Sequence, residues 1–133
     1  MKEILSKSAA SVQGALNEKG IRSTVVELPA STRTAQEAAN AIGCSVAQIV
    51  KSLIFRLKES QEPILVLASG VNRVNEAKIA QLLGEKIEKA DADFTRRVTG
   101  FAIGGIPPIG HKQKIRTLID EDLLKNEVCW AAA

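Results

Sequence analysis

Aromatic residues and long apolar runs are scarce in this chain, and each scarcity excludes a class of protein. Three phenylalanines and one tryptophan, with no tyrosine, are too few for a platform that stacks single-stranded nucleic acid. The longest uncharged apolar runs, such as Ile64 to Ala68, are far shorter than the roughly 20 residues that cross a bilayer. Residues 1–7 lack the apolar stretch of a signal peptide. We therefore expect a cytoplasmic protein without a membrane partner.

Groups for metal or nucleophile chemistry are scarce as well, because there is one histidine and there are two cysteines. Cys44 and Cys129 form no C-x-x-C pair and have no histidine beside them, so a zinc site is unsupported. Both lie among apolar residues, which predicts buried, reduced thiols. No Ser/His/Asp or Cys/His set can be paired, and no G-x-G-x-x-G or Walker loop is present. We expect no metal and no cofactor.

The 133 residues of the chain fit one domain of mixed helices and strands. Its net charge of +3 is compatible with a polyanionic partner but does not require one. Apolar spacing and caps predict helices from Leu5 to Gly20, from Thr34 to Gly43, from Asn75 to Gly84 and from Asp91 to Gly100, with one helical turn after Ser45. Strands are predicted at 23–28, 51–57, 64–69, 86–90, 113–119 and 128–132. Since 51–57 and 64–69 read as a hairpin, the fold class is mixed α/β (α+β).

Lys51 stands at the mouth of the apolar strand 51–57, between Val50 and Leu53. The simple interpretation is a lysine whose ammonium reaches water from the strand end. The functional interpretation is a partly desolvated ammonium that binds an anionic or carbonyl oxygen, or a neutral amine that acts as a base or forms a Schiff base. Taken by itself, Lys51 favours the simple interpretation.

The stretch 99–111 holds four of the nine glycines, two of the four prolines and the histidine. Glycine frees the backbone for close approach, and proline fixes φ, so the stretch predicts a rigid loop with bare amides. Such a loop is either a plain turn or a cradle whose amides bind an oxygen anion. His111, at its end, is more often a structural group than a base.

Four short motifs follow one another along the chain: Thr34-Ala35-x-x-Ala38-Ala39, Ile49 to Phe55, Gly70-x-x-Arg73-Val74-Asn75, and Gly104-Gly105-x-Pro107-Pro108-Ile109-Gly110-His111. In this order and spacing the chain resembles the YbaK-like aminoacyl-tRNA deacylases, related to the editing (INS) domain of bacterial prolyl-tRNA synthetase. The resemblance covers almost the whole chain. It implies one editing domain over 1–133, with a single mixed sheet that curls toward a barrel and is flanked by short helices.

The resemblance implies hydrolysis of the ester between a wrong amino acid and the 3′-terminal adenosine of tRNA, with alanine, cysteine and serine of the proline system as candidates. A synthetic site cannot reject smaller amino acids well, because one methylene is worth only about 1–3 kcal/mol. The implied partners are mischarged tRNA and, as a candidate, a prolyl-tRNA synthetase. The attack is implied to be substrate-assisted, without a metal.

By position, Lys51 matches the functional lysine of the family, and Gly104 to Pro108 matches its G-x-x-x-P loop. Lys51 is therefore the implied catalytic residue, which would hold the terminal adenosine, and the loop amides would hold the aminoacyl end. Thr34 and Asn72 have good explanations as a cap and a turn residue, and a substrate role is a secondary prediction for each. The predicted substrate-binding set is Gly104, Gly105, Ile106, Pro107, Pro108, Gly110, His111, Thr34 and Asn72.

One departure concerns the end of the sequence, because the family typically runs on beyond the position of Ala133 with a segment that walls the pocket. The expectation is a trimmed chain or a short member with an open pocket. A non-catalytic module that binds a nucleotide or aminoacyl-tRNA in the same pocket is the main alternative, and a structural domain without a pocket is the third. Convergence of Lys51 and the 104–108 amides on one cleft separates the first two from the third.

Overall fold

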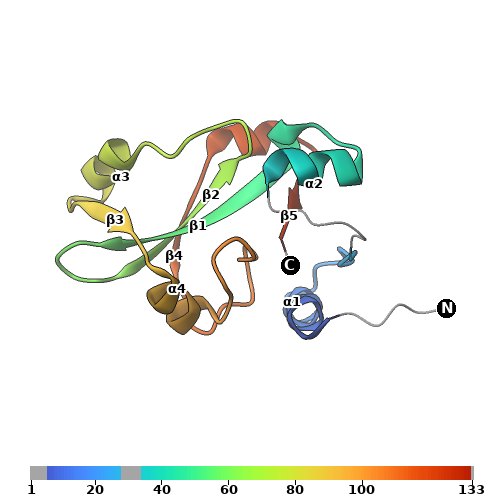
Figure 1. Ribbon diagram of the computed structural model, residues 1–133, viewed down its shortest axis with the longest axis horizontal. Helices are drawn as coiled ribbons and strands as arrows, with labels where there is room; N and C mark the ends of the chain where they lie inside the picture. Colours follow the sequence, from blue (N-terminus) through green and yellow to red (C-terminus); the bar gives the residue numbers. More distant parts are fainter. Residues whose placement is uncertain (1–5, 28–33, 133) are drawn as a thin grey trace.

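The computed structural model describes residues 6–27 and 34–132, which form one mixed sheet flanked by short helices (Figure 1). The expected mixed α/β class with short helices around one sheet is confirmed. Within the described residues the α-helices are α1 (Lys7–Glu18), α2 (Ala35–Ile42), α3 (Glu76–Leu83) and α4 (Ala92–Thr99), and the 3₁₀ helices are η1 (Val46–Gln48) and η2 (Glu121–Lys125). The strands are β1 (Ile49–Leu57), β2 (Pro63–Ser69), β3 (Ile87–Lys89), β4 (Arg116–Ile119) and β5 (Trp130–Ala131).

The helices α2, α3 and α4 begin and end where their caps predict, whereas α1 has Lys19 as its C-cap, one residue before the predicted Gly20. A side-chain oxygen of the residue before each of the four described α-helices accepts a hydrogen bond from a first-turn amide, which satisfies one of the donors left unpaired there. Glycines in the left-handed region end α2, α3 and α4. The predicted caps confirmed in this way are Thr34, Asn75 and Asp91 at the starts and Gly43, Gly84 and Gly100 at the ends.

β1 is the strand that organises the sheet. It pairs antiparallel with β2 along almost its whole length, which confirms the predicted hairpin, with Lys51 opposite Ala68. β4 continues the sheet parallel to β2. Two short strands also pair with β1: β5 runs parallel to its first residues, 49–50, and β3 runs antiparallel to its last, 55–57. The order β3-β1-β2-β4, with β5 also on β1, makes the sheet mixed.

Side-chain alternation along β1 and β2 divides the core into two clusters, one on each face of the sheet. Ile54 and Leu65 belong to the cluster that takes in residues of α1, α4 and the loop after α4. Phe55 and Ile64 belong to the cluster that takes in Ile79 of α3. Figure 1 shows α3 on the opposite side of the hairpin from α4. The neighbours Ile64 and Leu65 are both 0% exposed, so β2 is buried on both faces.

The predicted strand at 23–28 is wrong over its described part, residues 23–27, which are irregular. The amide of Val25 donates to Oε1 of Gln13 over 2.7 Å, and Nε2 of Gln13 donates to the Ser23 carbonyl over 3.2 Å. A side chain of α1 thus satisfies backbone groups that a neighbouring strand would otherwise pair, so a β-branched segment lies here without a ladder. Leu5 and Leu28, also used in the predictions, lie outside the described residues.

Smaller corrections concern the strand lengths and the cysteines. The predicted strands 86–90, 113–119 and 128–132 exist, but the ladders cover only Ile87–Lys89, Arg116–Ile119 and Trp130–Ala131. Both cysteines are free, as predicted. Their predicted burial is wrong, because Cys44 is half-buried and Cys129 is exposed. No helix in the described part of the chain is long and apolar enough to cross a membrane.

Candidate functional site

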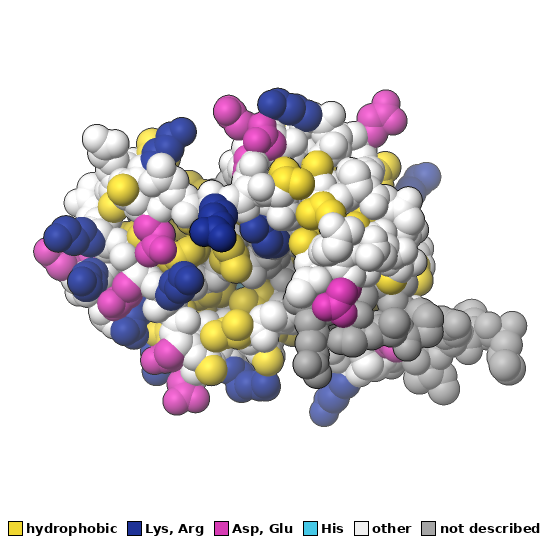
Figure 2. Space-filling view, turned by 45° about the horizontal axis from the view of Figure 1, so that its top comes forward, with side chains coloured by type: hydrophobic (Ala, Val, Ile, Leu, Met, Phe, Trp, Pro, Cys, Tyr) yellow, Lys and Arg dark blue, Asp and Glu magenta, His cyan; other side chains and the backbone are white. Residues whose placement is uncertain are grey.

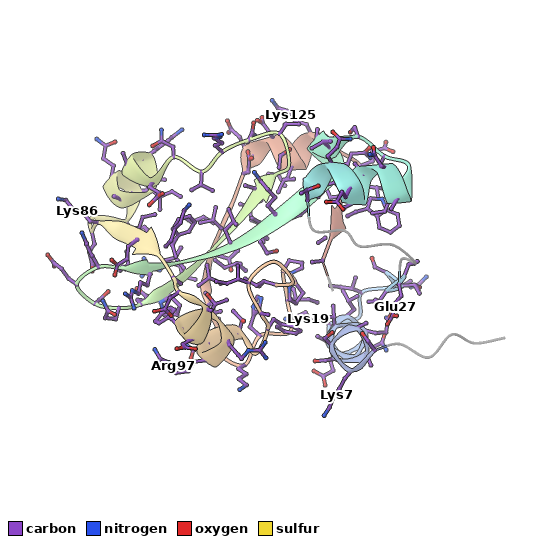
Figure 3. The ribbon with its side chains drawn as sticks, in the orientation of Figure 1. Lys7, Lys19, Glu27, Lys86, Arg97 and Lys125 are labelled. Carbon is purple, nitrogen blue, oxygen red and sulfur yellow. The ribbon has the colours of Figure 1, made fainter. Side chains whose placement is uncertain are left out.

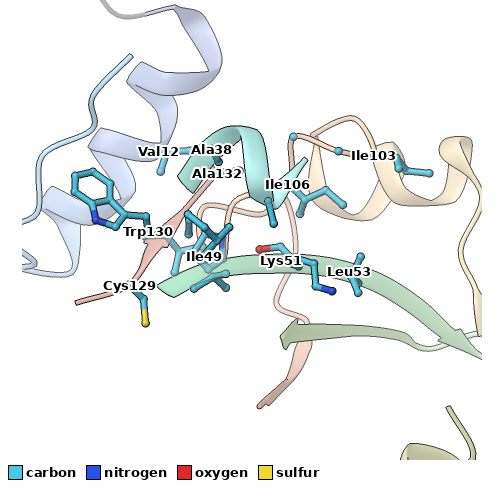
Figure 4. A pocket seen from close by; sticks show the side chains of 18 of the residues that line it. Val12, Ala38, Ile49, Lys51, Leu53, Ile103, Ile106, Cys129, Trp130 and Ala132 are labelled. Atoms are coloured by element: carbon cyan, nitrogen blue, oxygen red, sulfur yellow. The ribbon is translucent and has the colours of Figure 1, made fainter. Parts of the chain in front are cut away.

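A cleft opens at the edge of β1 where the sheet is incomplete. β5 covers residues 49–50 of this strand and β3 covers 55–57, so among the described strands none pairs with 51–53 on that edge. A cleft of about 1470 Å³ lies over this gap. It is larger than the roughly 300–1,000 Å³ of a typical small-molecule pocket, so it has room for a nucleoside with an attached amino acid. Figure 4 shows Ile49, Lys51 and Leu53 of β1 along it, with Ile103 and Ile106 across from them.

Lys51 lines this cleft from the middle of the gap and is half-buried. Alternation puts its side chain on the same face of β1 as Leu53, toward the turn that precedes α3. There its ammonium donates a hydrogen bond to the backbone carbonyl of Asn72. An ammonium carries three N–H donors, and this is its one hydrogen bond among the described residues. Two donors therefore remain for a ligand.

The loop after α4 supplies the opposite wall. Gly104 and Gly105 are exposed and line the cleft, whereas Ile106 is buried in the core and fixes the loop to the sheet. Pro107 is fully buried, and the Nε2–H of His111 donates to its carbonyl over 2.7 Å. The loop is thus anchored at one end by apolar burial and at the other by a hydrogen bond across its turn. The amide of Gly105 donates to the Ala102 carbonyl over 3.0 Å, whereas the amide of Gly104 has no hydrogen-bond partner among the described residues, as an oxygen-binding wall requires.

The structure brings together part of the predicted set. The members that line the cleft are Lys51, Thr34, Gly104, Gly105, Ile106 and Pro108. The members that do not line it are Asn72, Pro107, Gly110 and His111. Gly110 has a φ of 83° and its backbone passes close to Ala15 of α1, so the fold explains a glycine at this position without a substrate contact. Substrate contacts for the second group stay predictions.

Asn72 is held in a cluster of carboxylates at the start of η2. Its Nδ2 donates to Oδ2 of Asp120 and to Oδ2 of Asp122, over 2.8 Å in each case. Oδ2 of Asp120 also accepts from the Ser69 amide over 3.0 Å. The Asn72 hydrogen bond is the main cause that lowers the pKa of Asp120. The pKa of Asp122 is lowered chiefly by its hydrogen bond with Lys125 and then by Asn72. Both carboxyls are therefore ionised at neutral pH.

Acidification is expected to weaken this cluster. Both carboxyls have a lower pKa folded than unfolded, so they stabilise the fold above the ordinary aspartate value, about 3.9, and this contribution is lost as the pH falls through the lower folded values. The Tm of the wild type should fall below about pH 4, and the Tm difference from Asn72→Ala should shrink there. Circular dichroism melts from pH 7 to 3 measure it. A difference that stays constant over this range contradicts the expectation.

The sequence-based set missed several polar residues that line the cleft, and four of them stand out by charge or by burial. Arg73 and Lys89 are exposed cations at the cleft, and neither forms an ion pair within the described residues. Figure 2 shows Lys and Arg side chains beside a hollow with hydrophobic atoms at its floor. Ser52 and Thr95 have hydroxyls that are buried without a hydrogen-bond partner in the described structure. Charge alone does not single out Arg73 and Lys89 from the other 16 basic residues of the 18 in the chain.

A metal site is not formed by the described residues, which contain no group of three or more histidine, cysteine, aspartate or glutamate side chains that could hold an ion. The cleft instead combines a lysine, the free amide of Gly104 and apolar walls. Such a site can bind a polar or anionic group at the gap in β1 and a small apolar group against the loop.

Comparison with known proteins places these residues in a family. The family model described as the aminoacyl-tRNA editing domain matches residues 29–133. A proline–tRNA ligase from Limosilactobacillus fermentum is 37% identical over 94 residues, which are 68% of this chain and 16% of that enzyme. The chain thus spans a small part of the ligases it matches. The uncharacterized protein YwhH from Bacillus subtilis is 32% identical over 108 residues, which are 81% of this chain and 68% of YwhH.

Solved structures share the fold over nearly the whole chain. A crystal structure of a candidate trans-editing enzyme for prolyl tRNA synthetase superposes with a TM-score of 0.92 and 50% identity, covering 97% of this chain and 82% of that one. A structure from work on computational grafting of epitopes onto scaffold proteins has a TM-score of 0.90 and 46% identity, covering 96% and 81% of the two chains.

Proposed function

Because the chain belongs to the aminoacyl-tRNA editing domain family, we propose that it is a deacylase that hydrolyses mischarged aminoacyl-tRNA. One observation carries the proposal: Lys51 and the exposed glycines Gly104 and Gly105 line the same cleft. A positive charge and the free amide of Gly104 are complementary to the two ends of an aminoacyl ester, the anionic nucleotide and the carbonyl oxygen. The proposed substrate implies the cytoplasm as the place of action, and a prolyl-tRNA synthetase is the proposed partner that releases the mischarged tRNA.

In the proposed reaction, the ammonium of Lys51 holds the backbone or phosphate of the terminal adenosine, and the free amide of Gly104 holds the ester carbonyl. Water adds to that carbonyl, the bond to the ribose oxygen breaks, and the products are the free amino acid and tRNA with its 3′-terminal hydroxyl restored. We propose that the substrate assists the attack, through the ribose hydroxyl or a cysteine thiol. This assignment fits a cleft whose described lining lacks a histidine.

The amino acid removed is proposed to be smaller than proline. Ile106 and Pro108 form a stiff apolar wall beside the glycine amides, so the side chain would meet a surface that does not yield. The test is to offer tRNA for proline charged with alanine, cysteine, serine or proline to the full chain. We expect at least one of the first three to be hydrolysed, and proline to be spared by at least about tenfold. The proposal fails if none is hydrolysed, and tRNA binding without turnover would support a binding module instead.

Arg73 and Lys89 are proposed to contact phosphates of the single-stranded 3′ end. Each phosphate contact releases counterions, so the logarithm of the binding constant depends on the logarithm of the salt concentration with a slope of about −0.7 per contact for a single strand. We expect Arg73→Gln and Lys89→Gln each to make the slope less negative by roughly 0.7. Fluorescence anisotropy with uncharged tRNA over a series of salt concentrations measures it.

The control for this measurement is Lys86→Gln, which removes the same charge from the chain. Lys86 is exposed, does not line the cleft in the described structure and lies at the far end of the molecule, beside β3 (Figure 3). Its slope should equal that of the wild type. Equal slopes for all three variants would mean that only the net charge matters, and would contradict the proposed phosphate contacts.

A further inference from the structure

We propose that Asn72 is a positioning residue for Lys51, and that Asp120 and Asp122 hold it in place. The lysine ammonium donates its hydrogen bond to a backbone carbonyl, a group that every residue possesses. Asn72 is therefore distinguished not by supplying the acceptor carbonyl but by holding that carbonyl in place. The side chain of Asn72 turns away from the cleft and toward the carboxylates of η2, where it does that fixing.

Both N–H donors of the Asn72 side-chain amide are used. A primary amide has two N–H donors, and here one carboxylate oxygen from Asp120 and one from Asp122 accept them at 2.8 Å. Only the NH₂ end can serve two carboxylates, so the contacts also settle which way the amide points. Hydrogen bonds to ionised acceptors are roughly twice as strong as neutral ones. The two contacts fix the position of Asn72 in its turn.

The carboxylates are themselves fixed to the sheet. The amide of Asp120 donates to the Leu67 carbonyl over 2.8 Å, which continues the pairing of β4 with β2. Its Oδ2 receives the Ser69 amide, and its Oδ1 receives the Asp122 amide over 3.0 Å. Lys125 holds the second oxygen of Asp122 at 2.8 Å. A rigid chain of contacts thus runs from β2 and η2 through Asn72 to the ammonium of Lys51.

The consequence is a lysine with one donor bonded to a fixed carbonyl and two donors left for a ligand. A free lysine side chain has several rotatable bonds and loses entropy when a substrate orders it. A carbonyl held in place removes part of that loss before binding, which is preorganisation. Thr34 and the glycine loop need no such device, because a helix cap and two prolines already fix them.

The test compares Asn72→Ala with the wild type in deacylation of the substrate that the wild type cleaves best; this part rests on the proposed function. The variant keeps the backbone carbonyl at this position but loses both side-chain contacts, so the turn is released. We expect kcat to fall roughly tenfold while KM changes less than about threefold, because the ammonium charge remains. Asp122→Asn, which keeps an acceptor oxygen, should retain more activity than Asp122→Ala. An unchanged kcat in Asn72→Ala overturns the inference.

The matched control is Asn75→Ala, three residues further along the chain. Asn75 caps α3 by accepting from the Lys78 amide over 3.1 Å, and among the described residues it makes no hydrogen bond with the carboxylates. Its loss should lower the Tm by a few degrees and leave kcat unchanged at temperatures where the chain is folded. Equal loss of kcat in Asn75→Ala and Asn72→Ala would mean that general loosening is the cause, which also overturns the inference.

A second readout does not depend on deacylase activity. Acetylation by an N-hydroxysuccinimide ester, followed by peptide mass spectrometry, reports how freely each lysine amine is presented. Lys51 should be acetylated roughly tenfold faster in Asn72→Ala than in the wild type, because the variant weakens one charge-assisted hydrogen bond of its ammonium. The acetylation rate of Lys86 should be the same in both proteins. If the wild type hydrolyses no aminoacyl-tRNA, the proposed function fails, and the acetylation ratio still decides whether Asn72 positions Lys51. An unchanged ratio overturns that positioning.

Discussion

Lys51→Ala is expected to lower kcat/KM for the preferred mischarged tRNA by at least about 100-fold, which corresponds to roughly 2.7 kcal/mol of lost transition-state stabilisation. The substitution removes the cation at the gap in β1 and both of the N–H donors that a substrate could use. A charge-assisted hydrogen bond is worth about 1.5–3 kcal/mol, so two of them account for the expected loss. Single-turnover hydrolysis, measured as release of labelled amino acid, gives the rate.

Two controls keep this result interpretable. Lys51→Met retains the apolar stem that runs beside Leu53 and should melt within a few degrees of the wild type, yet it should lose activity like Lys51→Ala. Lys86→Ala removes one exposed charge outside the described cleft lining and should leave the rate unchanged. Activity of Lys51→Met equal to that of the wild type would show that the ammonium has no part in the reaction.

The helices of this chain could be predicted from sequence because their start and stop signals are local. An asparagine or aspartate whose side chain can accept from the amide three residues later is a local signal for a helix start. Asn75 and Asp91 both provide this signal. The hairpin of β1 and β2 was predictable for the same reason, since a polar turn between two apolar runs fixes their pairing.

The irregular segment 23–27 could not be predicted, because its partner is a single side chain from α1. Val25 and its neighbours have the composition of a strand, but the side-chain amide of Gln13 satisfies this backbone from ten to twelve residues away. No pattern in the residues around Val25 predicts that contact. The same limit explains why the strands predicted at 113–119 and 128–132 were too long, since an apolar run shows where a ladder can form but not where its partner ends.

Asn72 shows the corresponding limit for the candidate site. From sequence it is a turn residue, with a substrate role as a secondary prediction. In the structure that amide binds Asp120 and Asp122, which lie 48 and 50 residues away along the chain. Lys51 and the glycine loop were singled out because they match motifs of a known family, whereas an asparagine in a turn is ordinary.

Gly70 is the residue whose role the sequence left least explained, although it opens one of the four motifs. It follows β2 directly, and its amide donates to the Ile49 carbonyl over 2.8 Å. A Cβ at this position would lie 2.5 Å from the carbonyl oxygen of Val46, 2.9 Å from Cγ1 of Val46 and 3.0 Å from Cβ of Ala35. The constraint is therefore close packing of the chain beneath η1 and the start of α2, since real Cβ contacts are not that short.

Gly70→Ala is accordingly expected to destabilise the fold by about 1–3 kcal/mol, with a fall in Tm of roughly 5–10 °C, because the backbone of η1 cannot yield as a flexible side chain would. Displacement of α2 should also move Thr34 and Ala35, which line the cleft, so deacylation should fall even below the Tm. Gly14→Ala is the matched control: Gly14 lies in α1 with nothing within 4 Å of its added Cβ, and the same change should stabilise the helix by about 0.5–1 kcal/mol. The opposite signs of the two Tm shifts distinguish steric exclusion at Gly70 from a general effect of glycine replacement. A Gly70→Ala protein as stable as the wild type would contradict the expectation, because α2 and η1 could then move away from β2 without a loss of stability.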